Sequence, residues 1–382
     1  MYEMILFDVD GVLLSEKRCF DTTCLAVWEL LYSDQALGLP GGDFTPSPDE
    51  ETIRGVRRDV FDGEKVLEWL KAHGVNSNWD MVALLFGFQL QELLKQLFER
   101  QPEFVTRLLK EDLDRESLVR IGERFRGEGM EFLPRYGKVT ECLEGMSPDR
   151  VDLPGQINRL ARAWSGIQPS CFSHGGSLWK LGLDVYQEWY LGGDLYEKQE
   201  KKAPLHPEKI GFLKQEIPIV EPSAIRDMLD QLKQSGLTLG IGTGRPSLET
   251  QVPLEAMGWL PAFDPDRIVT ASDVRRAEKS RSDLGPLGKP HPFTYLKAFG
   301  GGASSDADTL AIRLPISGGE RVLIVGDSVA DLLAARQMGC HFAATLTGPS
   351  GEKARAKFEE LGADHILQDV TEVLPLIRSL RK

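Results

Sequence analysis

The chain has 382 residues, of which 41% are hydrophobic and 27% are charged. This length and composition are ordinary for a globular protein of two or three domains, and they exclude a disordered chain or a small disulfide-dependent scaffold. The 58 acidic and 45 basic side chains give a formal net charge of −13. This acidic balance disfavours a nucleic acid or an anionic membrane as the main partner, and a site for an anion would need local positive charge.

The sequence carries no sign of export or of membrane insertion. No apolar run approaches the roughly 18–20 residues of a membrane helix, and the N-terminus lacks the basic region of a signal peptide. The five cysteines are scattered, with no CxxC pair and no zinc-ligand spacing. We therefore expect a cytoplasmic protein with reduced thiols and no membrane association.

Short β-rich runs occur at the start of the chain and again in its C-terminal half. The predicted strands are Met4–Phe7, Leu237–Ile241, Arg267–Thr270, Arg321–Val325, His341–Leu346 and His365–Leu367. Apolar residues with helical spacing follow them, as in Ser223–Gln234, Ala330–Met338 and Glu352–Leu361. Short strands that alternate with helices are typical of a doubly wound, mostly parallel, Rossmann-like α/β sheet.

A long helical segment separates the first predicted strand from the others. Amphipathic helices are predicted at Arg54–Ala72, Asn78–Arg100, Glu103–Asp112, Arg115–Arg126, Leu153–Trp164 and Leu178–Leu191. This change in predicted secondary structure indicates an all-α domain inserted into an α/β domain. We expect residues 1–15 and 218–382 to form the α/β core, and residues 16–217 to form the inserted domain.

The first predicted strand ends in two carboxylates. Asp8 and Asp10 are two residues apart, so they point the same way if the extended backbone continues through Asp10. Crowded carboxylates repel each other and need a cation or a shared proton, and Mg²⁺ prefers such oxygen ligands. The alternative is that both residues cap a turn at Gly11, because Asp-Gly is common turn chemistry.

The strand predicted at Leu237–Ile241 ends in a glycine-rich turn. Thr243, Gly244 and Arg245 follow it, and a hydroxyl together with the backbone N–H groups of such a turn suits phosphate oxygens. The glycines of this segment lack the spacing of a dinucleotide fingerprint.

The strand predicted at Arg321–Val325 also ends in acid. Asp327 stands at the strand terminus, and Asp331 lies one helical turn further on, so both carboxylates can face one cleft. The alternative interpretation is that Asp327 is the N-cap of the next helix and Asp331 an acid of its first turn. It does not explain why three strands end in this chemistry.

A lysine that could contact a transferred phosphoryl group lies between these two motifs. Lys289 lies between Gly288 and Pro290, where its backbone has restricted freedom, and it could neutralise developing charge. Lys279 is the competing candidate for the same role.

Taken in order, the motifs resemble those of the haloacid dehalogenase (HAD) superfamily. The segment 8–12 resembles the first motif, 243–245 the second, Lys289 the third and 326–331 the fourth. Other C-terminal segments are similar to phosphoglycolate-phosphatase-like and β-phosphoglucomutase-like members, whose helical cap occupies the position of the insertion. The resemblance covers residues 1–15 and 218–382.

This resemblance implies an aspartyl-phosphate mechanism. Asp8 would be the nucleophile, and Asp10 would be the general acid and later the general base. Thr243 and Lys289, both counted as catalytic, would hold the phosphate oxygens, and Gly244 and Arg245 are further candidates for phosphate binding. The implied Mg²⁺ ligands are Asp8, Asp10 through its carbonyl oxygen, Asp327 and Asp331.

Two departures from the family pattern leave alternatives open. Arg245 stands where this branch usually has asparagine, so it either contacts the substrate or pairs with an acid. The insertion is unusually long, and its joints at 173–177 and 189–193 suggest that His174, Trp189 or Tyr190 contacts substrate. The alternative is that such aromatic residues belong to the core of the insertion.

We therefore expect a Mg²⁺-dependent phosphatase that hydrolyses a small phosphorylated metabolite. A phosphomutase of the β-phosphoglucomutase type is an alternative, because the two activities differ only in how the cap admits water. A non-catalytic protein that binds a partner through the enlarged helical insertion is a third interpretation, although it would not need the motif residues. The sequence does not indicate an oligomeric state.

Overall fold

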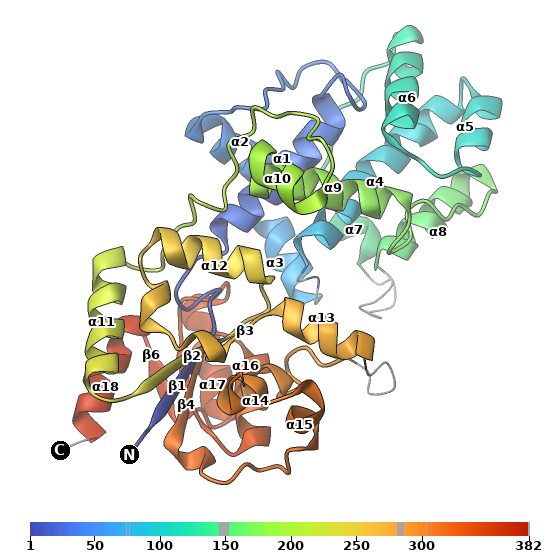
Figure 1. The fold of residues 1–382 in the computed structure, drawn as a ribbon. Helices are drawn as coiled ribbons and strands as arrows, with labels where there is room; N and C mark the ends of the chain where they lie inside the picture. Colours follow the sequence, from blue (N-terminus) through green and yellow to red (C-terminus); the bar gives the residue numbers. More distant parts are fainter. Residues whose placement is uncertain (74, 76, 145–152, 281–285, 303, 381–382) are drawn as a thin grey trace. The chain divides into compact units, whose positions relative to one another are not determined.

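In a computed structural model the chain folds into two compact units (Figure 1). The structure describes all residues except 74, 76, 145–152, 281–285, 303 and 381–382. The first unit, here called the α/β unit, comprises Met1–Glu16 and Leu213–Lys382. The second, here called the helical unit, comprises Lys17–Phe212.

The α/β unit is built on a six-stranded sheet with the strand order β3-β2-β1-β4-β5-β6. The strands are β1 Met4–Phe7, β2 Thr238–Gly242, β3 Ile268–Val269, β4 Val322–Gly326, β5 His341–Thr345 and β6 His365–Leu367. Every neighbouring pair is parallel. The prediction of a doubly wound parallel sheet is therefore confirmed, although the strand predicted at Arg267–Thr270 shortens to two residues.

Helices cover both faces of this sheet. The helices of this unit are α11 Pro222–Gln234, α12 Ser247–Ala256, α13 Ala271–Ser280, α14 Phe293–Gly300, α15 Asp306–Ala311, α16 Val329–Met338, α17 Arg355–Glu360 and α18 Val373–Leu380. Because alternate residues of a strand face opposite sides, Ile5 and Phe7 pack with α11 and α18, whereas Leu6 packs with α14 and α16. Figure 1 shows these two helix layers on either side of the strands.

The helical unit contains no strand among its described residues. Its helices are α1 Lys17–Tyr32, α2 Glu50–Val60, α3 Lys65–Ala72, α4 Asn78–Phe98, α5 Pro102–Leu108, α6 Arg115–Gly127, α7 Lys138–Leu143, α8 Leu153–Ser165, α9 Ser177–Leu191 and α10 Gly193–Glu200. The long helix α4 packs against α1, α5, α8 and α9. Its mostly buried residues make it the centre of this unit.

One predicted helix is divided in the structure. The segment Arg54–Ala72 forms α2 and α3, because Asp62, Gly63 and Glu64 have positive φ angles of 46°, 65° and 82°. Three successive residues in the left-handed region cannot continue a right-handed helix. The Asp-Gly pair is the turn signal that the helical periodicity obscured.

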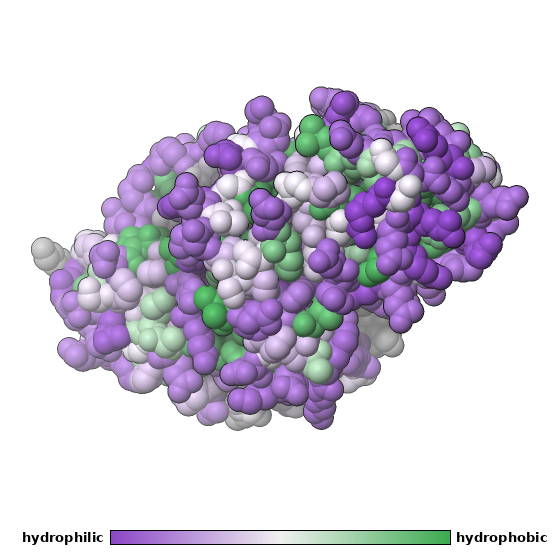
Figure 2. Space-filling model, turned by 90° about the horizontal axis from the view of Figure 1, so that it is seen from above, coloured by the Kyte–Doolittle hydropathy of each residue, from purple (hydrophilic) through white to green (hydrophobic). Residues whose placement is uncertain are grey.

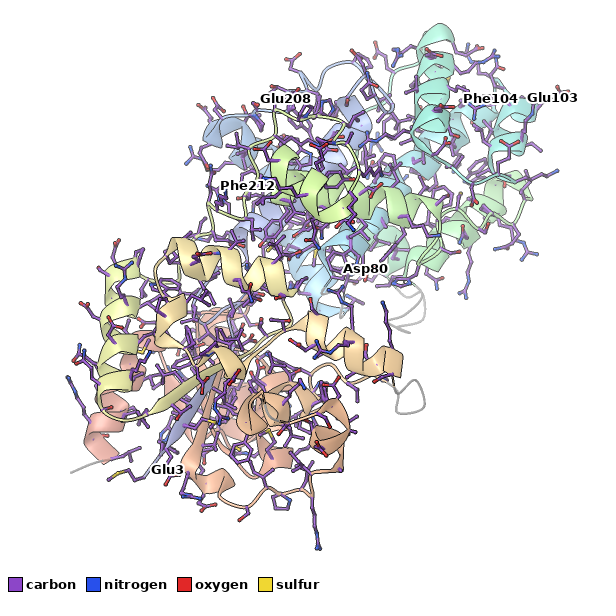
Figure 3. The ribbon with its side chains drawn as sticks, in the orientation of Figure 1. Glu3, Asp80, Glu103, Phe104, Glu208 and Phe212 are labelled. Atoms are coloured by element: carbon purple, nitrogen blue, oxygen red, sulfur yellow. The ribbon has the colours of Figure 1, made fainter. Side chains whose placement is uncertain are left out.

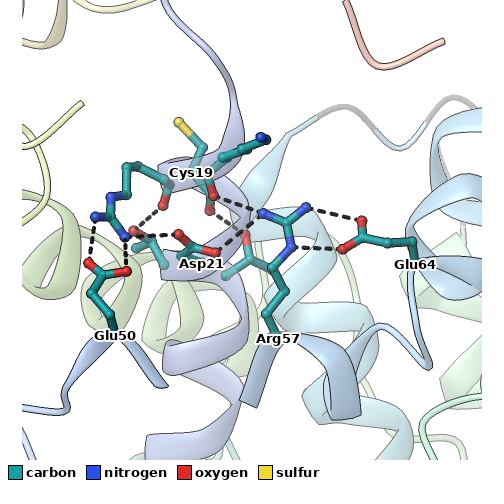
Figure 4. Close-up of polar contacts among 9 residues, drawn as sticks. Cys19, Asp21, Glu50, Arg57 and Glu64 are labelled. Carbon is teal, nitrogen blue, oxygen red and sulfur yellow. Dashed lines mark hydrogen bonds and ion pairs between the residues drawn. The ribbon is translucent and has the colours of Figure 1, made fainter. Parts of the chain in front are cut away.

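An ion-pair network joins α1 to the turn between α2 and α3 (Figure 4). The carboxylate of Asp21 lies between two guanidinium groups, 3.2 Å from Arg18 and 3.3 Å from Arg57. Arg18 also pairs with Glu50 at 2.6 Å, and Arg57 pairs with Glu64 at 2.8 Å. The left-handed residue Glu64 is thus held by the same network that anchors α2 to α1.

The aromatic residues singled out in the insertion divide between core and surface. Trp189 and Tyr190 are buried within the helical unit, so they belong to its packing, as their alternative interpretation held. His174 is exposed, and its Nε2 lies 3.5 Å from Asp80, labelled in Figure 3.

The sequence predicts reduced thiols. The five cysteines are free thiols, four of them buried. Among the described residues, no helix is both long and apolar enough to cross a membrane. On the face shown in Figure 2, apolar residues are scattered among hydrophilic ones.

Candidate active site

Three adjacent strands of the α/β unit end beside one another. Strand β1 lies between β2 and β4, and Phe7 is in register with Ile241 and Val325. The residue that follows each strand is Asp8, Thr243 or Asp327. Since the strands are parallel, these side chains lie at one edge of the sheet, where doubly wound sheets bind ligands.

Asp8 is held on both sides of its carboxylate. Its Oδ1 accepts a hydrogen bond of 2.7 Å from the Val9 N–H, and its Oδ2 lies 2.8 Å from the Lys289 ammonium. Burial raises the pKa of Asp8 to about 7, although the charge of Lys289 opposes this rise. A cation beside Asp8 therefore decides whether it is ionised at neutral pH.

Lys289 is the lysine that the fold brings to this edge. Its ammonium bridges Asp8 and Asp331, at 2.8 and 2.7 Å, and lies 4.8 Å from the ring centre of Tyr295. Burial alone would lower the pKa of Lys289, but the two carboxylates outweigh burial and raise it. Lys279, the competing candidate, is exposed on α13.

Asp331 is fully buried and accepts hydrogen bonds at both oxygens. Tyr295 donates its hydroxyl to Oδ1 at 2.7 Å, and Ser328 donates its hydroxyl to Oδ2 at 2.5 Å. Ser328 also caps α16, because its Oγ accepts from the Asp331 N–H. Asp331 therefore has the contacts of a group that fixes the position of Lys289.

Three carboxylates at this edge could share a cation. Oxygen atoms of Asp8, Asp327 and Asp331 all lie within 4.8 Å of one another. Burial and the charges of Asp331 and Asp8 raise the pKa of Asp327 well above its usual value. One lysine does not balance three acids, and clustered carboxylate oxygens are the donors that Mg²⁺ prefers. The residues present therefore fit a magnesium ion.

Two glycines leave room for the Asp327 carboxylate. A Cβ atom at Gly11 or at Gly348 would lie 2.2 or 2.1 Å from its Oδ2. Any side chain at either position would displace this oxygen. Gly11 has in addition a φ of +67°, which disfavours other residues there.

The carboxylate of Asp10 does not belong to this cluster, which corrects the expectation that Asp8 and Asp10 point together. The chain turns after Val9, whose carbonyl accepts from the N–H groups of residues 12, 13 and 14. Asp10 instead pairs with Arg245, whose Nη2 and Nε lie 2.6 and 2.8 Å from its Oδ1. Extended geometry ends at Phe7, so the alternation of side chains along a strand does not extend to Asp8 and Asp10.

In the second motif, the hydroxyl of Thr243 and the guanidinium of Arg245 have different partners. Thr243 is buried, and its Oγ1 accepts a hydrogen bond of 3.1 Å from the Arg245 N–H, which leaves its own proton to be donated. Gly244 is exposed. Arg245 is buried with its guanidinium on the carboxylates of Asp10 and Glu216, which agrees with the alternative that it pairs with an acid.

Sequence reasoning missed three residues of this site. Tyr295 lies on α14, Glu216 precedes α11, and Gly348 follows β5. Each lies far along the chain from the residue it contacts, and none stands in a motif. Only the tertiary fold reveals these contacts.

Comparison with known proteins supports the resemblance to the HAD superfamily. A family model described as HAD-hydrolase-like matches residues 286–373. A crystal structure solved as a target of the Northeast Structural Genomics Consortium is 36% identical, covers 99% of each chain and has a TM-score of 0.86. A comparison with curated proteins found no match.

Two more distant structures were also found. One is a HAD-superfamily hydrolase, subfamily IA, variant 1, from Geobacter sulfurreducens PCA, which is 17% identical over 98% of this chain and 96% of that chain. The other is a predicted phosphoglycolate phosphatase from Haemophilus somnus 129PT, which is 14% identical over 98% of both chains. The TM-score is 0.39 for each.

The α/β unit thus combines a parallel sheet with a cluster of three carboxylates at its strand ends. The segment 286–373, which contains Lys289, Asp327 and Asp331, is similar to the HAD-hydrolase-like family.

Proposed function

We propose that the protein is a Mg²⁺-dependent phosphatase that hydrolyses a small phosphate monoester through an aspartyl-phosphate at Asp8. The observation that carries this proposal is the bridge that Lys289 makes between Asp8 and Asp331 beside Asp327. A nucleophile, a fixed cation and a cation-binding carboxylate cluster are what phosphoryl transfer requires.

In the first step, a carboxylate oxygen of Asp8 forms a bond to phosphorus as the bond from phosphorus to the ester oxygen breaks. The leaving oxygen takes a proton from Asp10. In the second step, water attacks phosphorus and gives its proton to Asp10, and the bond from phosphorus to Asp8 breaks. The products are an alcohol and inorganic phosphate, and both aspartates return to their initial states.

The remaining residues supply positive charge and hydrogen bonds to the phosphoryl oxygens. Lys289 lies between Asp8 and Asp331, so it can contact a phosphate attacked by Asp8. The Thr243 hydroxyl can donate its proton to a second oxygen. Asp8 and Asp327 would hold Mg²⁺, which supplies positive charge to the phosphate when it is bound. Local charge of this kind lets a protein with a net charge of −13 bind an anion.

A panel of phosphate monoesters tests the proposal. We expect release of inorganic phosphate from p-nitrophenyl phosphate and from at least one metabolite ester, dependent on Mg²⁺ and abolished by Asp8→Asn. Asp230→Asn, an exposed substitution on α11, is the matched control and should retain full activity. No release by the wild-type protein on a broad panel would refute the proposal.

The same panel separates the alternatives. Transfer of the phosphoryl group to another position of a sugar phosphate, without release of inorganic phosphate, would identify a phosphomutase. The role of residues 16–217 as a cap that selects substrate stays a prediction.

A further inference from the structure

A chain of three charged groups runs inward from Asp10. Two donors of Arg245, Nη2 and Nε, both reach the same carboxylate oxygen, Oδ1, at 2.6 and 2.8 Å. A third donor, Nη1, reaches the Glu216 carboxylate at 2.7 Å. The structure therefore ties a motif aspartate to a residue that lies outside every motif.

Burial increases steadily along this chain. The exposed fraction of the side chain is 31% for Asp10, 4% for Arg245 and 0% for Glu216. A buried guanidinium is costly unless its charge is balanced, and Glu216 balances it from within the protein. The planar donors of arginine have a fixed geometry, so fixing one edge of the guanidinium with Glu216 also fixes the edge that faces Asp10.

The two hydrogen bonds on Oδ1 leave Asp10 with one oriented oxygen. Among the described residues, none donates a hydrogen bond to Oδ2 of Asp10. The partly exposed carboxylate can therefore present Oδ2 to a leaving-group oxygen or to a water, while Oδ1 stays fixed. Proton transfer requires such a geometry, because the donor must lie within hydrogen-bond reach of the oxygen it protonates.

We propose that Arg245 and Glu216 are positioning residues for Asp10, and that they orient it for protonation of the leaving group. This inference rests on the proposed phosphatase function. It assigns Arg245 a contact with Asp10 and none with the phosphate, which is the second of the two alternatives that the sequence left open. It gives Glu216, which precedes α11 and lies in no motif, a part in the reaction.

The dependence of kcat/KM on the leaving group distinguishes a role in positioning Asp10 from a role in phosphate binding or in folding. A nitrophenolate leaves readily without a proton, whereas an alkoxide needs one from a general acid. The comparison uses kcat/KM for p-nitrophenyl phosphate and for an alkyl phosphate, since this parameter reports formation of the aspartyl-phosphate. The inhibition constant of inorganic phosphate is measured in parallel as a readout of phosphate binding.

The variants avoid leaving an unpaired charge in the interior. The double variant Arg245→Met with Glu216→Gln removes both charges of the buried pair. Arg245→Lys keeps the charge but loses the fork that donates twice to Oδ1. Arg321→Met is the matched control, because Arg321 forms a solvent-exposed ion pair with Glu3, the residue that precedes β1 (Figure 3).

We expect the double variant to lower kcat/KM for the alkyl phosphate roughly 100-fold, within the range of general acid catalysis, but to lower that for p-nitrophenyl phosphate less than about tenfold. The inhibition constant of phosphate should not change, Arg245→Lys should be intermediate, and Arg321→Met should match the wild type.

An equal loss for both esters, or a matching rise in the inhibition constant, would overturn the inference while the phosphatase function stands. If the double variant does not fold, Arg245→Lys and Glu216→Gln decide by the same comparison. A wild-type protein inactive on both esters would remove the phosphatase function and this inference with it.

Discussion

Gly348→Ala tests whether the position of Asp327 matters to a cation site. The added Cβ would lie 2.1 Å from Oδ2 of Asp327 and 2.9 Å from its Cγ. Ordinary contact between such atoms begins near 3.4 Å, so the carboxylate oxygen must move by at least about 1.3 Å. Unlike Gly11, Gly348 does not have a positive φ, so alanine adds little backbone strain. The substitution thus moves one carboxylate without changing any charge.

A displacement of this size should weaken Mg²⁺ binding more than it weakens folding. Changes that misplace a metal ligand typically cost 10- to 100-fold in metal affinity, which is about 1.4–2.7 kcal/mol. The assay is the Mg²⁺ concentration that half-saturates the rise in melting temperature, together with the Mg²⁺ dependence of phosphate release. We expect both midpoints to rise by the same factor.

Gly55→Ala is the matched control for this substitution. A Cβ at Gly55, within α2, would meet nothing within 4 Å, so Mg²⁺ binding should not change. Stability should rise by about 0.5–1 kcal/mol, because alanine favours a helix over glycine. If Gly348→Ala leaves the Mg²⁺ midpoints unchanged and the protein folded, the Asp327 carboxylate does not bind the metal as we argue.

Three further predictions concern stability. Tyr295→Phe removes the 2.7 Å hydrogen bond to the buried Asp331, and should lower the free energy of unfolding of the α/β unit in urea by about 1.5–3 kcal/mol; no change would mean that Asp331 does not depend on it. Lys209→Met removes a fully buried ammonium held by two buried glutamates, and should cost about 3–5 kcal/mol. Lys202→Met, in an exposed ion pair, should cost at most about 1 kcal/mol, and equal losses would contradict the role of burial. Burial lowers the pKa of His206 below 6.5, so the unfolded chain binds more protons on this residue as the pH falls through 6.5. Stability should therefore fall in that range, and His206→Gln should remove this part of the pH dependence.

Helices and strands with a clear periodicity of apolar residues were well predicted from the sequence. Strands β1 and β6 have the predicted ends, and α11 differs from its prediction by one residue. Apolar periodicity identifies such elements because each buries one face or both faces against its neighbours. The division of α2 from α3 was missed because three left-handed residues interrupt a pattern that otherwise continues.

Part of the site was also evident from the sequence. Asp8, Thr243 and Asp327 each directly follow a strand, and parallel strands place their carboxyl ends at one edge of the sheet. The sequence could not decide between Lys289 and Lys279, because reach across the sheet edge depends on the path of the loops.

The sequence by itself thus determined an acidic α/β protein with a helical insertion and three polar strand ends. The tertiary structure decided which carboxylates share a site, that Lys289 bridges Asp8 to Asp331, and that Asp10 pairs with Arg245. The reason is physical: backbone periodicity is local, whereas an ion pair depends on two side chains that arrive from distant segments. Arg245 and Glu216 meet because the segment that precedes α11 lies beside the residues that follow β2.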